Sequence, residues 1–203
     1  MNNPTEVIQG SDEWFALRLG KVTASKVSDV MSKGTGRATY MDDLLAERMS
    51  GQSKPSFTND AMRWGTEQEP YARQAYEVDQ ECFVEETGFW QHDELALGVS
   101  PDGLVGEDGL VEIKCPNSST HVGWLRAKKV PAKHIKQIQC QLWVTGRSWC
   151  DFVSYDPRMI EAKNRLMVVR CERDDALIAK MELEVRKFLT ELDGWTKGDP
   201  DEQ

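Results

Sequence analysis

The residues with the clearest chemical potential are Asp102, Glu112 and Lys114. Two short apolar runs, at 103–105 and 110–113, flank a Gly/Asp cluster, a pattern typical of a β-hairpin. Because side chains alternate along a strand, Glu112 and Lys114 are expected to share one face. With a turn centred on the acidic pair between the runs, Asp102 lies across the hairpin beside Glu112. Two carboxylates and an ammonium then meet, a set that suits Mg²⁺ or Mn²⁺ and the orientation of a water.

A plainer interpretation competes with this one. A Glu-x-Lys pair is common on solvated strand faces, and Asp-Gly after a proline is usually a turn. The residues beside Glu112 and Lys114, however, are Val111, Ile113 and Cys115, so this strand is expected to be buried. Because buried charges need ionic partners or a metal, the apolar neighbours favour a metal site over a solvated face.

Helices and strands are expected on both sides of the hairpin. Ser11, followed by two acids and an apolar stripe, predicts a short capped helix that Gly20 ends. Thr23 is expected to cap a second helix, and Thr39 a third that ends at Gly51. Residues 59–78 are expected to form two helices that meet near 66–70, because Pro70 suits the first turn of a helix. The other expected helices are at 118–127, 132–144 and 174–192, the strands at 82–90, 95–99, 149–155 and 165–171, and the loops at 33–37 and 52–57.

Helices packed on a mixed sheet with a central meander give an α/β (α+β) sandwich. We expect one domain over residues 1–203, with a core over about 11–194 and a polar tail over 195–203. No apolar run approaches a membrane span and no signal sequence opens the chain, so we expect a cytoplasmic protein that does not contact membranes. The five cysteines are scattered and form no Cys-x2-Cys pair, which predicts reduced thiols without zinc or disulfide roles.

Charge is segregated along the chain. The net charge of −9 alone argues against a polyanionic partner. Residues 77–112 hold eleven acids and no Lys or Arg, whereas 113–150 hold seven Lys and Arg and no acid. Residues 14–40 hold five basic residues against one Asp. Such segregation can build a basic patch on an acidic protein, although folding can also interleave these segments.

The order of the motifs resembles a known family. Pro101-Asp102, followed after nine residues by Glu112-Ile113-Lys114, is similar to the PD-(D/E)XK nuclease motif. The flanking segments resemble the phage lambda exonuclease, or YqaJ-type viral recombinase, family: Trp14-x3-Arg18-x-Gly20-x2-Thr23-Ala24-Ser25, Trp64-Gly65-x3-Glu69, Ser100-Pro101-Asp102-Gly103, Glu112-x-Lys114-Cys115-Pro116, Gln137-x-Gln139 and Tyr155-Asp156-Pro157-Arg158. The resemblance covers residues 11–190. It implies a restriction-endonuclease-like mixed central sheet flanked by helices, with extra N-terminal helices.

The same resemblance implies a metal site with two Mg²⁺ ions, for which Mn²⁺ would substitute. Asp102 would be shared between the metals. Glu112 and the Ile113 carbonyl would complete the first site, and Glu69 would serve the second. Without the resemblance, Glu69 is better explained as a first-turn carboxylate stabilised by the helix macrodipole, and Glu67 is a close neighbour that is easily confused with it.

Two further residues are expected to act in catalysis. Lys114 would orient or deprotonate the attacking water. Gln137 and Gln139 are two apart on a helix and face different directions, and the family pattern favours Gln137 as the residue that positions water or metal ligands. An ordinary helix amide is the alternative for Gln137.

The resemblance also implies contacts with a DNA end. Arg18 and Ser25 would form a pocket for a terminal 5′-phosphate, because a guanidinium and a helix N-terminus both bind phosphate oxygens. Met62 matches an apolar position that would wedge between terminal bases, although core packing is the commoner fate of a helix methionine. Lys33 and Arg37, in the loop after the second helix, would follow a DNA groove.

These features imply an Mg²⁺-dependent 5′→3′ exonuclease that degrades one strand of linear double-stranded DNA from 5′-phosphorylated ends. The family further implies a homotrimer that works with a phage-type single-strand annealing protein in recombination, inside a bacterial host. Two alternatives remain open. One is another PD-(D/E)XK nuclease, such as a restriction or RecB-like enzyme; the iron–sulfur nucleases need a cysteine quartet that this chain does not space. The other is a non-catalytic DNA-binding module of the same fold, against which the intact acidic set argues.

Overall fold

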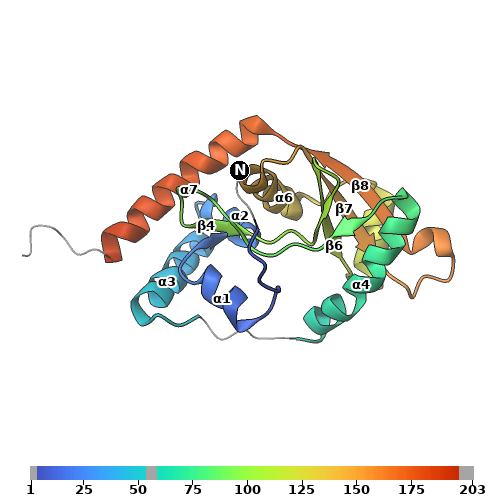
Figure 1. Ribbon diagram of the computed structural model, residues 1–203, viewed down its shortest axis with the longest axis horizontal. Coiled ribbons are helices and arrows are strands. Elements are labelled where there is room, and N and C mark those ends of the chain that lie inside the picture. Colours follow the sequence, from blue (N-terminus) through green and yellow to red (C-terminus); the bar gives the residue numbers. More distant parts are fainter. Residues whose placement is uncertain (1–3, 54–58, 197–203) are drawn as a thin grey trace, which may run out of the picture.

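Two β-sheets and the helices around them make up the molecule (Figure 1). The computed structural model describes residues 4–53 and 59–196. The strands are β1 (Val22–Thr23), β2 (Val84–Glu85), β3 (Trp90–Gln91), β4 (Leu97–Val99), β5 (Gly103–Val105), β6 (Gly109–Lys114), β7 (Trp149–Tyr155) and β8 (Leu166–Glu172). The helices are α1 (Asp12–Arg18), α2 (Val27–Val30), α3 (Thr35–Ser50), α4 (Asp60–Gln80), α5 (Ser118–Ala127), α6 (Ala132–Thr145) and α7 (Asp175–Thr196), with 3₁₀ turns η1 (Ala24–Lys26) and η2 (Ala162–Asn164).

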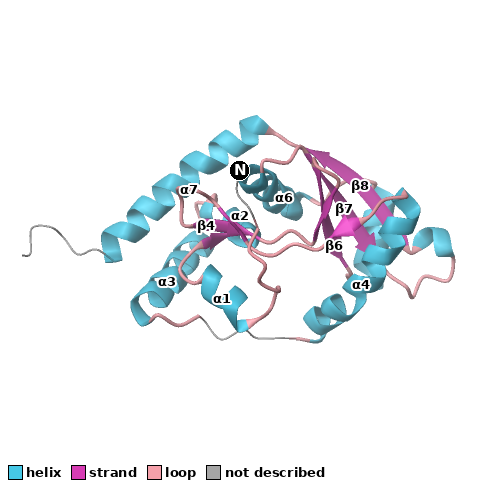
Figure 2. Cartoon of the chain, in the orientation of Figure 1, coloured by secondary structure: helices cyan, strands magenta, loops and turns pink. Residues whose placement is uncertain are grey.

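The larger of the two sheets has five strands in the order β2-β5-β6-β7-β8. β6 and β7 are parallel, and every other neighbouring pair in this sheet is antiparallel. Parallel neighbours need a long crossover, which α5 and α6 provide between β6 and β7. Helix α4 packs on one face of the sheet and α5 and α6 pack on the other (Figure 2). The expected mixed sheet flanked by helices is confirmed.

The alternation of side chains along β6 separates two hydrophobic clusters. Val111 belongs to a cluster with Tyr76 of α4. Leu110 belongs to a larger cluster with Ile138 of α6. Glu112, two residues after Leu110 on the strand, shares its face. The predicted separation of Glu112 from its apolar neighbours is therefore confirmed, and the carboxylate points toward α6.

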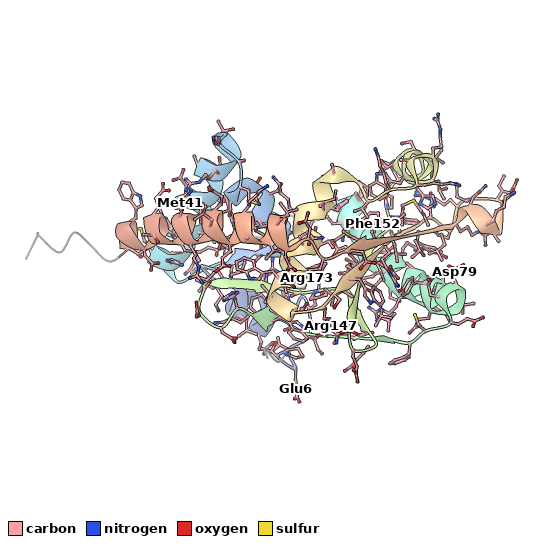
Figure 3. All side chains as sticks on the ribbon, turned by 90° about the horizontal axis from the view of Figure 1, so that it is seen from above. Glu6, Met41, Asp79, Arg147, Phe152 and Arg173 are labelled. Atoms are coloured by element: carbon pink, nitrogen blue, oxygen red, sulfur yellow. The ribbon has the colours of Figure 1, made fainter. Side chains whose placement is uncertain are left out.

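The three-stranded sheet joins the N-terminal segment to the strand that precedes Asp102. β1 pairs with β4 in parallel, with Val22 opposite Leu97, and β3 pairs with β4 in antiparallel. Helices α2 and α3 pack against α7, and the Tyr40 and Phe188 rings stack at 5.8 Å between centroids. Viewed from above, α7 runs along the molecule beside Met41 of α3 (Figure 3).

The N-terminal helices differ in part from prediction. α1 has the expected cap, because the Ser11 side chain accepts a hydrogen bond from the Trp14 N–H at 3.2 Å. The second helix is replaced by η1 and the short α2, and Thr23 makes no side-chain cap there. α3 begins at Thr35 rather than after Thr39, so that expected cap is wrong. Arg37 in its first turn forms an ion pair with Glu191 of α7 at 2.6 Å. The sequence around Arg37 does not predict this tertiary contact.

Two other expectations are also wrong. α4 is one continuous helix that contains Pro70, not two helices. Proline removes only one intrahelical N–H bond, and the burial of Ala72 and Tyr76 against the sheet holds the remaining turns. The expected strand at 82–90 is divided between β2 and β3, which belong to different sheets.

At the C-terminal end, α7 continues to Thr196, past its expected end at 192. Most of the expected loop at 52–57 and most of the polar tail lie outside the described residues. All five cysteines are free thiols, and none of the helices described is long and apolar enough to cross a membrane.

Candidate active site

The β5–β6 hairpin brings Asp102 to Glu112 as the spacing predicts. Gly103 pairs with Val111, so Asp102 follows in register toward Glu112. The Ile113 N–H donates to Asp102 Oδ2 at 2.7 Å, which fixes the carboxylate against the edge of β6. Gly103 is required after Asp102 because a Cβ at that position would overlap Val84 Cγ1 of the neighbouring strand.

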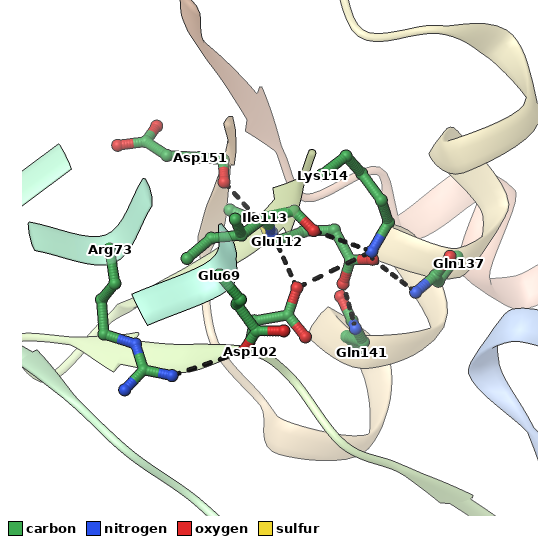
Figure 4. A network of polar contacts seen from close by, with 10 residues as sticks. Glu69, Arg73, Asp102, Glu112, Ile113, Lys114, Gln137, Gln141 and Asp151 are labelled. Carbon is green, nitrogen blue, oxygen red and sulfur yellow. Dashed lines mark hydrogen bonds and ion pairs between the residues drawn. The ribbon is translucent and has the colours of Figure 1, made fainter. Parts of the chain in front are cut away.

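The Lys114 ammonium lies among three oxygens of this hairpin (Figure 4). Its Nζ lies 2.5 Å from Glu112 Oε1 and donates to the Ile113 carbonyl at 3.0 Å. Asp102 Oδ2 is 3.7 Å away. The side chains of Asp102 and Glu112 are 9% and 1% exposed, so the ammonium is the main charge that compensates two nearly buried carboxylates.

Two glutamines of α6 hold both oxygens of Glu112. Gln137 Nε2 donates to Oε1 at 2.6 Å, and Gln141 Nε2 donates to Oε2 at 2.7 Å. Gln139 faces away and bonds the Glu172 carbonyl at 2.7 Å, which agrees with the predicted divergence of Gln137 and Gln139. Sequence reasoning missed Gln141. Its i+4 spacing from Gln137, which places both on one face of a helix, is the signal that would have found it.

The cluster shifts the titration of its own groups. Burial, followed by repulsion from Glu112, raises the pKa of Asp102 to about 7. Burial by itself lowers the pKa of Lys114, but the Glu112 and Asp102 carboxylates outweigh burial and raise that pKa above its ordinary value. Lys114 is therefore a firmly protonated ammonium in the metal-free chain, and it acts as a counter-ion and hydrogen-bond donor.

Helix α4 brings Glu69 to the other side of the cluster. Burial raises the pKa of Glu69, while Arg73, whose Nη2 lies 3.3 Å from Oε1, opposes that shift. Glu67 is exposed, whereas Glu69 is half-buried and its charge acts on Asp102 and Lys114, so Glu69 is the α4 carboxylate that belongs with the cluster. Met62 is also exposed and lies seven residues before Glu69, which places both on the same side of the helix.

The oxygens of the cluster fit a hard divalent cation. Glu112, Asp102 and the Ile113 carbonyl already surround one positive charge, the Lys114 ammonium, and oxygen ligands of this kind are those that Mg²⁺ and Mn²⁺ prefer. Within the described residues, no three His, Cys, Asp or Glu side chains form a group that could hold a metal ion. Glu69 is thus not gathered with the other two carboxylates into a single three-carboxylate site.

A pocket of about 200 Å³ opens beside α1, with Arg18 in its wall. The Arg18 guanidinium stacks on the Trp14 ring at 3.9 Å, and the Trp14 indole N–H donates to Ser100 Oγ at 2.9 Å. Ser100 precedes Asp102 by two residues, so this chain of contacts links the Arg18 pocket to the carboxylate cluster. Burial lowers the pKa of Arg18, with Tyr40 and then Glu47 opposing the shift.

The other expected DNA contacts have mixed surroundings. Ser25 is exposed and is not in the pocket wall, although its Oγ lies 3.4 Å from Oγ1 of Thr23, which does line the pocket. Lys33 lies in the turn before α3. Arg37 is held by Glu191 and lies over the Phe188 ring at 5.1 Å, so a DNA contact through Arg37 would have to compete with its ion pair.

Arg158 brings together residues that are distant in the sequence. The Arg158 guanidinium lies 4.4 Å from the centre of the Trp64 ring. It donates to Asp156 Oδ1 at 2.7 Å and to the Pro116 carbonyl at 2.9 Å. The segments around Trp64, Pro116 and Arg158 therefore support one another in space.

The chain is similar in sequence and in fold to known proteins. Residues 13–148 match the YqaJ-like viral recombinase domain. An alkaline exonuclease from Laribacter hongkongensis, whose structures include a complex with dAMP, is 49% identical with a TM-score of 0.86, and the match covers 90% of this chain and 93% of that one.

This chain belongs to the YqaJ-like viral recombinase family. A phage-related exonuclease from Haemophilus somnus shares the fold at 16% identity and a TM-score of 0.70, over 85% of this chain and 93% of that chain. An uncharacterized protein of Acanthamoeba polyphaga mimivirus is 27% identical over 71% of this chain, but the chain spans only 28% of that relative's length.

The part of the chain that matches the YqaJ-like domain includes both the carboxylate cluster and the Arg18 pocket. Gln141 also lies within it, whereas the segment 155–158, which packs on Trp64, lies beyond it. In this family member, the cluster and the pocket are joined through Trp14 and Ser100.

Proposed function

We propose that this protein is a divalent-metal-dependent exonuclease that degrades one strand of linear double-stranded DNA in the 5′→3′ direction, beginning at a 5′-phosphorylated end. The observation that carries the proposal is the enclosure of one cationic group by Glu112, Asp102 and the Ile113 carbonyl. The Arg18 pocket, linked to that cluster through Trp14, supports the choice of a phosphorylated end.

The coarser statement rests on the family. A DNA exonuclease is the enzyme class that follows from the YqaJ-like domain together with the alkaline exonuclease at 49% identity. That relative forms a complex with dAMP, a mononucleotide of the kind that stepwise hydrolysis of DNA releases. Mg²⁺, the polarity and the preferred end are the finer parts of our proposal.

Glu112 and Asp102 are the residues that would hold the metal, with the Ile113 carbonyl as a third ligand and Glu69 toward a second ion. A bound divalent ion neutralises phosphate charge and makes a bound water a stronger nucleophile. Gln137 and Gln141 keep Glu112 in one orientation. The Lys114 ammonium donates hydrogen bonds that orient the water or offset the negative charge that develops on the phosphate.

Arg18 would bind the terminal phosphate. Its planar fork can bind two phosphate oxygens, and the Trp14 ring beneath it restricts the guanidinium to one plane. Ser25 would add a hydroxyl from η1, and Met62 would contact the terminal base pair from α4. Each cut leaves a new 5′-phosphate on the remaining strand, so the same pocket would be refilled after every step.

Assembly and partners extend the proposal. A protein with a net charge of −9 can bind DNA more easily if the basic surfaces of several copies face one channel. On that basis, and on the family resemblance, we propose a homotrimer. A phage-type single-strand annealing protein is the proposed partner, and the bacterial cytoplasm the proposed location. Light scattering tests the trimer: a particle of 23.1 kDa, the mass of one chain, would contradict it.

The proposed polarity is tested with one linear duplex that carries different labels at its 5′ and 3′ ends. With Mg²⁺, we expect early release of the 5′ label as a mononucleotide, while the 3′ label stays in long fragments. A duplex with 5′-hydroxyl ends should be digested much more slowly. Early release of the 3′ label, or cutting of a closed circular duplex, would contradict the proposal.

A further inference from the structure

We propose that the basic segment between α5 and α6, residues 126–136, binds the sugar–phosphate backbone of DNA next to the active site. This inference rests on the proposed function, because it names a second contact for the same substrate. The segment, called the α5–α6 basic segment below, contains five cationic residues, which are Arg126, Lys128, Lys129, Lys133 and Lys136.

The positive charge of the α5–α6 basic segment is not neutralised within the described part of the chain. None of its five cations forms an ion pair with a described residue, and residues 113–150 contain no acid. Four of the five, at 126, 128, 129 and 133, are exposed. Basic side chains that do face acids include Arg37, Arg48, Arg63, Arg73, Arg158, Arg170, Arg173 and Arg186. Free positive charge is therefore concentrated here, on a protein whose net charge is strongly negative.

The segment leads directly into the catalytic cluster. Gln137, whose amide contacts Glu112, follows Lys136 on α6 (Figure 4). Lys133 lies four residues before Gln137, so both are on the same side of the helix. The α5–α6 basic segment is thus one helical turn from the residue that holds the metal-site carboxylate. A strand whose scissile phosphate lies at Glu112 would have its neighbouring phosphates within reach of these lysines.

The position of Lys133 and Lys136 also opposes the local preference of a helix. Lys133 lies in the first turn of α6, where the macrodipole is positive and cations are disfavoured, and Lys136 follows in the second turn. Pro131 at the N-cap makes no side-chain hydrogen bond to the first-turn N–H groups. The His134 N–H donates to the Pro131 carbonyl at 2.9 Å, so an anion at this end would meet the lysines and the two N–H groups that precede that of His134. A phosphate backbone supplies such anions in series, at a spacing that a cluster of several lysines can follow.

Neutralising lysines that contact phosphates changes the salt dependence of binding in a calculable way. Each phosphate contact contributes about 0.9 to the slope of log K against log salt concentration on duplex DNA. This slope is negative. If Lys129, Lys133 and Lys136 each contact a phosphate, their loss reduces its magnitude by about 2.7. Sequence preference should not change, because backbone contacts carry no base information.

The experiment compares two triple variants that remove the same amount of charge. The test variant carries Lys129→Gln, Lys133→Gln and Lys136→Gln. The matched control carries Lys163→Gln, Lys180→Gln and Lys187→Gln, at positions outside the segment. Binding of a fluorescent blunt duplex is measured over a range of KCl concentrations, with Ca²⁺ in place of Mg²⁺ to prevent turnover. Thermal unfolding checks that both variants are folded.

We expect the test variant to bind DNA more weakly than the control. The magnitude of its slope of log K against log salt concentration should be smaller than that of the control by about two to three. A third variant, with arginine at the same three positions, should keep the wild-type slope. Equal slopes in the test and control variants would overturn the inference. Failure of the proposed function would appear differently, as a wild-type protein that binds DNA but does not digest 5′-phosphorylated ends in Mg²⁺.

Discussion

Gln141→Leu tests whether the glutamines of α6 serve the metal site or only the packing of the helix. Gln141 is 1% exposed and donates to Glu112 Oε2 at 2.7 Å, while its own Oε1 is buried without a partner among the described residues. Gln139 is equally buried on the same helix, yet it bonds the Glu172 carbonyl and accepts from the Asp174 N–H, away from the cluster. The two positions therefore make a matched pair.

The magnitudes follow from what each substitution leaves unpaired. Gln141→Leu loses a bond to a charged group worth about 1.5–3 kcal/mol, but it also removes an unsatisfied carbonyl oxygen whose burial costs about 1–3 kcal/mol. These two terms nearly cancel, and Glu112 Oε2, left without its donor, adds a further cost, so we expect a net loss of stability of about 1 kcal/mol, or about 2–4 °C in Tm. Gln139→Leu loses two good hydrogen bonds and leaves two backbone groups unpaired, so we expect about 3 kcal/mol and a larger fall in Tm.

The two substitutions should rank the other way in their effect on metal binding: Gln141→Leu should weaken it more than Gln139→Leu. Without Gln141, Oε2 of Glu112 loses its donor and the carboxylate is held less firmly, and the lost charged hydrogen bond corresponds to a metal site weaker by about 10- to 100-fold. The assay is exonuclease rate against Mg²⁺ concentration, with calorimetric titration of Mn²⁺ as a readout independent of activity. We expect Gln141→Leu to shift both curves and Gln139→Leu to shift neither. A metal requirement that follows Tm in both variants would refute the assigned role of Gln141.

Three other predictions concern the DNA end, the metal and alkaline stability. Arg18→Ala should slow digestion of 5′-phosphorylated ends by about 10- to 100-fold, which corresponds to about 1.4–2.8 kcal/mol of activation free energy. Arg18→Lys should recover part of this loss. Equal slowing of digestion on 5′-hydroxyl ends would make Arg18 a general DNA contact. EDTA should abolish turnover, and Ca²⁺ should support binding without turnover, so measurable digestion in EDTA would contradict a metal mechanism. Burial, and then the hydrogen bond to Asp151, raises the pKa of Tyr76, so the folded state keeps a phenol proton that the unfolded state releases above about pH 10. Stability should therefore fall as pH rises past that value, and Tyr76→Phe should flatten the fall in urea unfolding; an unchanged fall would assign it to other groups.

The hairpin could be predicted from sequence because its determinants are local. Alternation along β6 and the Gly-rich turn fix which residues oppose one another, and so Asp102, Glu112 and Lys114 meet as expected. Gln141 could not be placed with the same ease. Which face of α6 meets β6 depends on the whole crossover, and the Gln-x-Gln pattern drew attention to the pair at 137 and 139 instead.

Tertiary contacts account for the expectations that were wrong. Pro70 is a strong local break signal, yet the packing of α4 on the sheet keeps one helix through it. Arg37 was expected to face DNA from a loop, but α3 begins earlier and Arg37 faces Glu191 of α7. The linking of Arg18 to Ser100 through Trp14 also needed the fold, because these residues are far apart in the chain.

The measurement that tests the central claim most directly is hydrolysis by Asp102→Asn on DNA that the variant demonstrably binds. Binding and release of mononucleotides from a 5′-phosphorylated linear duplex are followed in the same Mg²⁺ buffer, with wild-type protein beside the variant. If Asp102 and Glu112 hold the metal, the variant should bind DNA and melt much like the wild type but release nucleotides at least about 10³-fold more slowly, a loss of about 4 kcal/mol of transition-state stabilisation. Release at a rate near that of the wild type would contradict the assignment of the active site.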